Sequence, residues 1–207
     1  MTAGDDEFVL YAHVRSGNAY KAALMLALTD TPFRLQKIDL PGGEQRGEEY
    51  LAMNPFGKIP MLAHGDIVIR QSNTILLYLA SHTGSFGAKD QKQRLRASEW
   101  LFWEQDQMFP GVGRTRFFTK VVEGDPAVVA YFRALGEAAL ATLERQLALS
   151  AFLTGDEPTI ADIGVYAYAR LAEEAGFDMA ARPKIVAWRK AMEALPGYKT
   201  PAELLDP

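Results

Sequence analysis

The order of apolar segments at the start of the chain constrains its fold more than any other feature. Residues 8–11 are a short apolar run with the length of a buried strand, and residues 18–29 are rich in Ala, Leu and Met, which favour a helix. Thr31-Pro32 ends that helix, and residues 33–40 have the pattern of a second strand. A strand, a helix and a strand in this order predict two parallel strands joined by a crossover.

A β-hairpin and another helix are predicted to follow. The signals are, in chain order, a short polar helix at 44–51, a turn at 54–57, and two apolar strands at 60–63 and 67–69. Ser72 is a suitable N-cap for a helix over residues 73–81. The first part of the chain is therefore expected to be a small α/β domain with the element order βαβ-ββα.

The second part of the chain has helical patterns only. Helices are predicted at 91–118, 126–149, 159–174 and 183–194. The Gly- and Ser-containing stretch before them separates the two kinds of pattern. We therefore expect a first domain over residues 1–83, a linker over 84–90 and an all-helical domain over 91–207.

Composition excludes several functional classes. The 207 residues allow one large domain or two small ones, and 48% are apolar, which is enough for a core. The formal net charge is -4 with no basic block, so no nucleic-acid partner is expected. No apolar run is long enough to span a membrane, and the acidic N-terminus lacks the pattern of a secretory signal. We therefore expect a cytoplasmic protein with no membrane partner.

The chain contains no cysteine, which excludes disulfides, thiolate metal sites and a cysteine nucleophile. It does not exclude thiol chemistry on a bound substrate. The three histidines, His13, His64 and His82, are far apart in the sequence and lack metal-ligand spacing. We therefore expect no metal site.

Four segments together resemble the glutathione S-transferase family. They are LYAHVRSGNAYKAAL at 10–24, NPFGKIPML at 54–62, IRQSNTILLYLA at 69–80 and TIADIGVYA at 159–167. The resemblance covers nearly the whole chain. It implies a thioredoxin-like first domain that binds glutathione as a co-substrate, and a helical second domain with the electrophile pocket and dimer contacts. It also implies a homodimer and no permanently bound cofactor.

The resemblance assigns residues to the peptide end of glutathione. In the family, the bond between Ile59 and Pro60 is cis, and the main chain of Ile59 pairs with the glutathione backbone. Such pairing is strand-like recognition of a peptide. An ordinary trans proline at the start of a strand is the alternative. Lys58 is similar to the residue that reaches the glycine carboxylate, although a solvated surface lysine explains it equally well.

The resemblance also assigns the γ-glutamyl end. A serine at a helix N-terminus offers a hydroxyl and backbone N–H groups to a carboxylate, with help from the helix dipole. Ser72 matches the family residue that holds the γ-glutamyl carboxylate, and an N-cap role is compatible with this. Gln71 matches a position that is often glutamate, and its amide can still accept a hydrogen bond from the ligand's amino group.

Ser16 is the main candidate for activating the glutathione thiol. A free thiol has a pKa of about 8.5, and lowering it by about two units requires roughly 2.7 kcal/mol. A hydrogen bond to the sulfur can supply about 1.5–3 kcal/mol and a helix N-terminus about 0.3–1 kcal/mol, so one hydroxyl and one helix end suffice. Tyr11 is the rival, because YAHVRSG resembles theta- and zeta-type enzymes with a tyrosine five residues before the serine. Tyr11 is also a plausible core residue.

Two other functions remain open. One is a zeta-like glutathione-dependent isomerase, although Gly17 and Asn18 replace the second serine and the cysteine of that loop. The other is a non-catalytic interaction module of the same fold. Related bacterial sequences often have a cysteine or serine where this chain has Ala19, so a mixed disulfide with the protein is excluded. The leading prediction is a transferase that conjugates the glutathione thiolate to a hydrophobic electrophile.

In the second domain, an aromatic segment is expected to provide both core packing and the electrophile pocket. Its large residues are Trp100, Leu101, Phe102, Trp103, Met108, Phe109, Phe117 and Phe118. Arg114 and Arg116 are each expected in one of three places, namely a ligand cleft, the solvent-exposed surface or a contact with a dimer partner. The sequence does not decide among the three. Asp162 is predicted to be part of a capping box, and its replacement by alanine to cost about 0.5–2 kcal/mol.

Overall fold

The computed structural model describes residues 7–206, which form two compact units. The first unit runs to Ser85 and also includes the chain from Leu195 onward, and the second covers Phe86–Ala194. We expected residues 91–207 to form one helical domain, so the grouping of the C-terminal segment with the first unit is a difference. The acidic residues 1–6, on which the expectation of a cytoplasmic protein partly rests, lie outside the described residues.

A four-stranded mixed sheet forms the centre of the first unit. Its strands are β1 (Phe8–Ala12), β2 (Phe33–Lys37), β3 (Met61–His64) and β4 (Ile67–Arg70), in the order β2-β1-β3-β4. β1 is parallel to β2, whereas β3 is antiparallel to both of its neighbours. The predicted crossover and hairpin are both confirmed. β2 ends three residues earlier than predicted, although the Ile38 N–H still donates to the Ala12 carbonyl at 2.9 Å.

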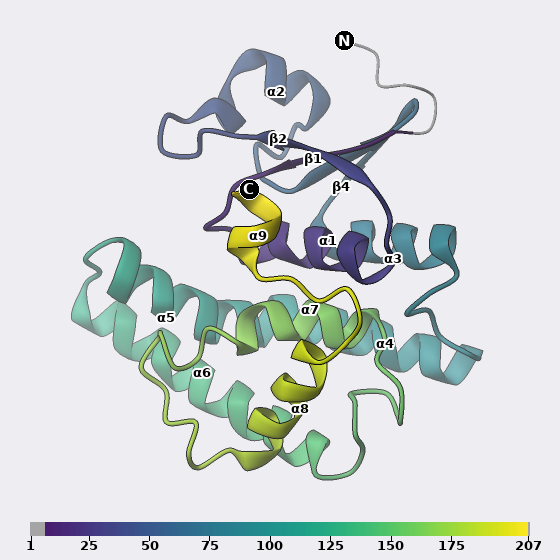
Figure 1. Ribbon diagram of the computed structural model, residues 1–207. Helices are drawn as coiled ribbons and strands as arrows, with labels where there is room; N and C mark the ends of the chain where they lie inside the picture. Colours follow the sequence, from purple (N-terminus) through teal and green to yellow (C-terminus); the bar gives the residue numbers. More distant parts are fainter. Residues whose placement is uncertain (1–6, 207) are drawn as a thin grey trace. The chain divides into compact units, whose positions relative to one another are not determined.

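Helices cover both faces of this sheet (Figure 1). α1 (Gly17–Leu28) and α3 (Ser72–Thr83) pack against each other on one face. On the other face, Tyr50 of α2 (Glu48–Met53) packs in a buried cluster with Met61. A 3-10 turn over Glu44–Arg46 precedes α2, where one helix was predicted. The element order is the predicted βαβ-ββα.

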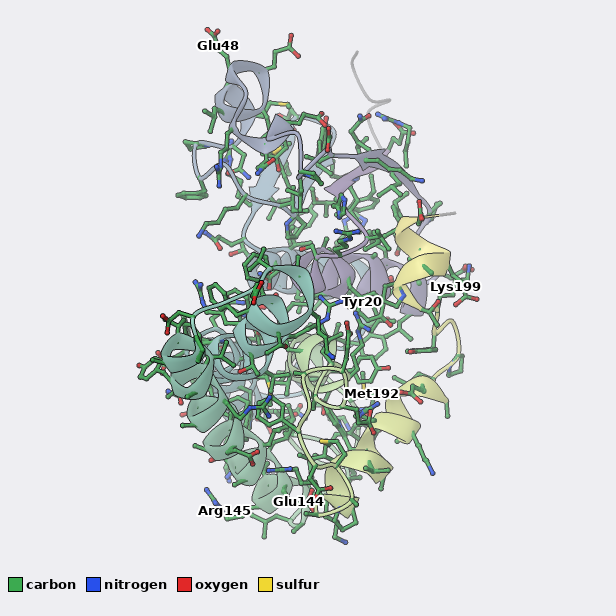
Figure 2. All side chains as sticks on the ribbon, turned by 90° about the vertical axis from the view of Figure 1, so that its left-hand side faces the viewer. Tyr20, Glu48, Glu144, Arg145, Met192 and Lys199 are labelled. Carbon is green, nitrogen blue, oxygen red and sulfur yellow. The ribbon has the colours of Figure 1, made fainter. Side chains whose placement is uncertain are left out.

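The C-terminal segment is attached to α1, which explains why it belongs to the first unit. α9 (Pro201–Leu205), which the sequence did not predict, packs against α1 (Figure 1). Before it, the Tyr20 hydroxyl donates to the Lys199 carbonyl at 2.9 Å (Figure 2). Gly197 has a φ of +83°, and a Cβ there would lie 2.6 Å from the Ala27 carbonyl oxygen. Only glycine combines this conformation with so close an approach.

The second unit is entirely helical. Its main helices are α4 (Gln91–Trp103), α6 (Pro126–Leu147), α7 (Ile160–Ala169) and α8 (Pro183–Glu193). α4 continues through wide π-type turns (Glu104–Gly113), α5 (Arg114–Arg116) and further wide turns (Phe117–Val121). Pro110 lies within the first of these stretches and favours its wide turns, because proline has no N–H to donate and its ring clashes with the preceding turn. No helix within residues 7–206 has the length and apolarity that a membrane crossing requires.

Glycines and a glutamate fix how these helices pack. A Cβ on Gly111 would lie 2.6 Å from the backbone of Gly136 on α6, so the two helices touch through their main chains. Glu144 of α6, which is labelled in Figure 2, accepts hydrogen bonds from the backbone N–H groups of Lys184 and Ile185, both at 2.9 Å. Glu144 therefore satisfies two free donors at the start of α8.

Asp162 is more deeply embedded than a surface cap. It forms the predicted capping box with Thr159, whose N–H donates to Oδ2 at 2.9 Å. Its Oδ1 also accepts from the Leu153 N–H at 2.9 Å and the Trp188 indole N–H at 3.0 Å. The side chain is fully buried, and burial raises the pKa of Asp162 to about 6 although these hydrogen bonds oppose the rise. Asp162 thus links α7, α8 and the preceding loop.

Candidate functional site

Ser16 occupies the N-cap of α1, immediately beyond the end of β1. Its backbone is extended, with φ -92° and ψ 112°, and its Oγ accepts the Ala19 N–H at 3.1 Å. The residue is half-buried, and its hydroxyl donates to no other residue of the described chain. A serine hydroxyl has one proton to donate. That proton is therefore available to a ligand beside the N-terminus of α1.

Tyr11, the rival to Ser16, lies within β1 opposite Met61 of β3. Its half-buried ring packs against the cluster of Ile38, Tyr50 and Met61 and meets the Tyr50 ring edge-on, with centroids 6.4 Å apart. The ring therefore contributes to packing beneath α2. This contact does not occupy the Tyr11 hydroxyl, so the choice between Ser16 and Tyr11 is left to experiment.

The loop before β3 has the features expected of a peptide-binding edge. The Ile59–Pro60 bond is cis, as the resemblance implied. Within residues 7–206, neither the N–H nor the C=O of Ile59 makes a backbone hydrogen bond. The carbonyl of Lys58 accepts from the Tyr50 hydroxyl at 2.9 Å and the Asn54 amide at 2.6 Å, while the Lys58 side chain is exposed. The loop is thus anchored from behind, leaving the Ile59 main chain available.

The start of α3 differs in detail from the expectation. Gln71, not Ser72, is the N-cap, and its φ of +69° is uncommon for a residue other than glycine. Its side chain is exposed and makes no capping bond. Ser72 is the first helical residue and is buried, where an exposed N-cap hydroxyl was expected. Backbone strain of this kind is concentrated at ligand-binding sites.

Three residues beside Ser72 were missed by the sequence analysis. The Ser72 hydroxyl donates to Asn18 Oδ1 at 3.1 Å and lies 3.4 Å from the ammonium of Lys21, which also donates to Asn73 Oδ1 at 3.2 Å. Lys21 is fully buried. The signal was a single lysine inside the otherwise apolar AYKAALMLAL, because a lysine is almost never fully buried unless it has partners.

The fold brings together two histidines that are distant in the sequence. The rings of His64 and His82 have centroids 5.0 Å apart, and His64 Nδ1 lies 2.6 Å from the Tyr78 hydroxyl. Phe8 stacks on His64 at 3.9 Å. Among residues 7–206, no group of three or more His, Cys, Asp or Glu side chains is arranged to hold a metal ion. We interpret this group as an aromatic cluster.

The aromatic segment of the second unit has several different environments. Met108 is buried, Phe102 is 78% exposed, and Trp100 and Trp103 meet edge-on at 4.8 Å. The two tryptophans line a cleft of about 450 Å³ together with Leu149 and Leu153. This volume is within the usual range of small-molecule sites.

The two arginines that the sequence did not rank are distinguished by their contacts. Arg116 forms an ion pair with Glu174 at 2.8 Å within the second unit. Arg114 is exposed, and its guanidinium lies 5.4 Å from the Phe109 ring centroid and 5.6 Å from that of Phe132. Arg114 is therefore the better candidate for contact with a ligand.

Comparison with known proteins identifies the family. The glutathione S-transferase N-terminal domain profile matches residues 7–81, and the C-terminal domain profile matches residues 126–191. Glutathione S-transferase 3 of Zea mays is 30% identical over 201 residues, which cover 92% of this chain and 90% of the maize protein. The chain belongs to the glutathione S-transferase family. The fold predicted for this family member, a thioredoxin-like domain followed by helices, is confirmed.

Two further similarities indicate the range of activities in this transferase family. The solved structure of a glutathione S-transferase from Pseudomonas fluorescens is 35% identical, with a TM-score of 0.88, and the match covers 94% of this chain and 98% of that one. The disulfide-bond oxidoreductase YfcG of Escherichia coli strain K12 is 28% identical over 187 residues, covering 86% of this chain and 87% of YfcG. The relatives therefore include both glutathione S-transferases and a disulfide-bond oxidoreductase.

Proposed function

We propose that this protein is a glutathione transferase in which Ser16 stabilises the glutathione thiolate and the thiolate attacks a hydrophobic electrophile. The observation that carries the proposal is the hydrogen-bond state of Ser16. Its Oγ already accepts the Ala19 N–H as a helix cap, and its proton has no acceptor in the part of the chain that the structure describes. A thiolate at the start of α1 would supply that acceptor.

The rest of the ligand would bind along the edge of the first unit. The unpaired main chain of Ile59 matches a peptide backbone, as in strand-like recognition. The start of α3, with Gln71 and Ser72, would receive the γ-glutamyl group, and Lys58 is long enough to reach toward the glycine carboxylate. Glutathione is then the co-substrate, and no step requires a resident cofactor.

The thiol pKa of bound glutathione tests the assignment of Ser16. Ser16→Gly removes the hydroxyl, and glycine at an N-cap costs only a few tenths of a kcal/mol, so the helix is retained. Losing a hydrogen bond worth about 1.5–3 kcal/mol should raise the thiol pKa by about 1–2 units. The pKa is measured from the ultraviolet absorbance of the thiolate, and turnover with a chlorodinitrobenzene as the electrophile.

Tyr11→Phe is the matched control, because it removes one hydroxyl from the rival residue. If Ser16 activates the thiol, Ser16→Gly lowers kcat and raises the thiol pKa, whereas Tyr11→Phe changes neither. The reverse pattern would assign the role to Tyr11. Tight glutathione binding by the wild type, without turnover of any electrophile, would favour the non-catalytic alternative.

Glutathione-dependent disulfide reduction is a second candidate, favoured by the similarity to YfcG. The chain has no cysteine, so both electrons must come from glutathione thiols. A bound thiolate would attack one sulfur of a disulfide, forming a mixed disulfide and releasing a thiol. A second glutathione would then attack the mixed disulfide, giving oxidised glutathione and the second thiol. Assays with a small symmetrical disulfide distinguish this reaction from conjugation.

The second unit would supply the electrophile pocket and dimer contacts. Arg114 and the Trp100–Trp103 cleft are the candidates for contact with the second substrate. On α4, Leu95 is 60% and Phe102 is 78% exposed, and their seven-residue spacing places both on one helix face. That face favours the expected homodimer. Sedimentation of Phe102→Glu tests this, because a charge on a buried dimer contact should yield monomers.

A further inference from the structure

Lys21 is a fully buried lysine on α1, beside the start of α3. Burying an ammonium costs several kcal/mol, and the cost is reduced only by well-placed partners. Two of its partners are the side chains of the first two residues of α3, Ser72 at 3.4 Å and Asn73 at 3.2 Å. The Lys21 amino group is therefore held at the helix end where a carboxylate is favoured.

The hydrogen-bond roles at Ser72 follow from the chemistry of Lys21. An ammonium has donors and no acceptor, so the Ser72 oxygen must accept from it. The single Ser72 proton is thereby directed to another acceptor, which is Asn18 Oδ1 at 3.1 Å. A ligand carboxylate at the start of α3 would compete with this amide oxygen for the proton. A carboxylate is the stronger acceptor, because charge-assisted hydrogen bonds are stronger than neutral ones.

We propose that Lys21 is a positioning residue for the carboxylate end of glutathione. It orients the Ser72 hydroxyl to donate to the γ-glutamyl carboxylate and adds a buried positive charge to the N-terminus of α3. This inference rests on the proposed function. It predicts that Lys21 contributes to binding affinity only when the ligand has that carboxylate. A merely structural role of Lys21 would affect ligands with and without the carboxylate alike.

The test compares two ligands and two proteins by calorimetric titration. The ligands are glutathione and γ-aminobutyryl-Cys-Gly, which lacks only the γ-glutamyl carboxylate. The proteins are the wild type and Lys21→Met, which replaces the ammonium with an apolar chain of similar length. Lys21→Met should weaken glutathione binding by about tenfold or more, a loss equivalent to one hydrogen bond to a charged group, and change binding of the analogue by less than about twofold.

Control variants separate the charge at this position from general effects. Lys37→Met removes a surface lysine of β2 that pairs with Asp206, and should alter neither affinity. Ser72→Ala should reduce the preference for glutathione over the analogue, and Lys21→Met should add less than its full effect to that loss, because part of its effect acts through the same hydroxyl. If thermal melting shows that Lys21→Met does not fold, Lys21→Gln, which removes the charge but retains a donor, takes its place in the comparison.

Equal weakening of both ligands by Lys21→Met would overturn the proposal, and so would no change in either affinity. Fully additive effects of the Lys21 and Ser72 variants would also overturn it. Absence of any glutathione binding by the wild type would overturn the proposed function as well. If the wild type binds glutathione but Lys21→Met changes the affinity for both ligands to the same extent, only the role of Lys21 is overturned.

Discussion

Replacement of Asp162 by alanine tests a fully buried polar group of the helical unit. As a simple helix cap, Asp162 would contribute about 0.5–2 kcal/mol. In the structure it accepts N–H donors from Leu153, Thr159 and Trp188, and it is fully buried. Each buried donor left without an acceptor costs about 1–3 kcal/mol, and breaking a buried network typically costs 3–5 kcal/mol. We therefore expect a loss of about 4 kcal/mol where Asp162 is protonated.

The loss should depend on pH, with a definite sign. The pKa of Asp162 rises from its ordinary value of 3.8 to about 6, because burial disfavours the charged form. A raised pKa means that the contribution of Asp162 to stability is complete below about pH 3.8 and is lost as the pH rises through about 6. The shift of about two units corresponds to about 3 kcal/mol. Alanine has no such dependence, so the difference between wild type and Asp162→Ala should shrink as pH rises.

Urea denaturation at two pH values measures this difference. We expect Asp162→Ala to be less stable than wild type by about 3 kcal/mol near pH 4.5, where about 1 kcal/mol of the contribution is already lost, and by about 1 kcal/mol near pH 7.5. Glu203→Ala is the matched control, because Glu203 closes an exposed capping box with Thr200. Hydrogen bonds from Thr200 lower the pKa of Glu203, so its small contribution is present above the unfolded pKa and lost as the pH falls through the folded pKa.

Two outcomes would refute the reasoning about Asp162. A difference that grows with pH would mean that the hydrogen bonds outweigh burial and that Asp162 is ionised in the folded protein near its ordinary pKa or below. If Asp162→Ala lowers the free energy of unfolding by less than about 1 kcal/mol at both pH values, the three N–H donors find water or other acceptors in the variant.

Two glycines give further predictions. Gly111→Ala should destabilise the protein by about 1–3 kcal/mol, because its Cβ would lie 2.6 Å from the backbone of Gly136; an unchanged urea midpoint would contradict that close approach. Gly197→Ala should lower the melting temperature more than Gly43→Ala. Both have nearly the same φ, +83° and +81°, but only at position 197 does the Cβ meet the Ala27 carbonyl. Equal changes in melting temperature would mean that the cost of alanine at a positive φ explains both substitutions and that the contact with Ala27 contributes nothing.

The sequence predicted the first unit well because its signals are local. The short apolar runs, the proline and glycine turns and the apolar helix each depend on neighbouring residues, and together they determine the topology. The return of α9 to α1 was missed because it depends on contacts distant in the sequence. The Tyr20 hydroxyl and the Lys199 carbonyl are 179 residues apart, and no local pattern reports such a pair.

The residues of the candidate site were named from the sequence, where they remain a prediction, but their hydrogen bonds were not predicted. Ser16 and Ser72 were both named, yet the sequence gives no information on which partner each hydroxyl has. The burial of Ser72 and its partners Asn18 and Lys21 depends on the packing of α1 against α3. The capping role of Asp162 was similarly predicted, whereas its bond to Trp188, 26 residues away, was not.

The two serines of the candidate site would place one residue type at two ends of the proposed ligand. The Ser16 oxygen accepts a backbone N–H, and the Ser72 oxygen accepts from an ammonium, so in each case the fold uses the acceptor and directs the proton. At Ser16 the proton has no acceptor among residues 7–206, and in the proposed function it would donate to a sulfur whose charge must be stabilised. The Ser72 hydroxyl donates to the amide oxygen of Asn18, which is a weaker acceptor than a carboxylate and can be displaced by one. In the proposed function, thiol activation and carboxylate recognition would therefore depend on separate hydrogen bonds, each fixed by its own helix end.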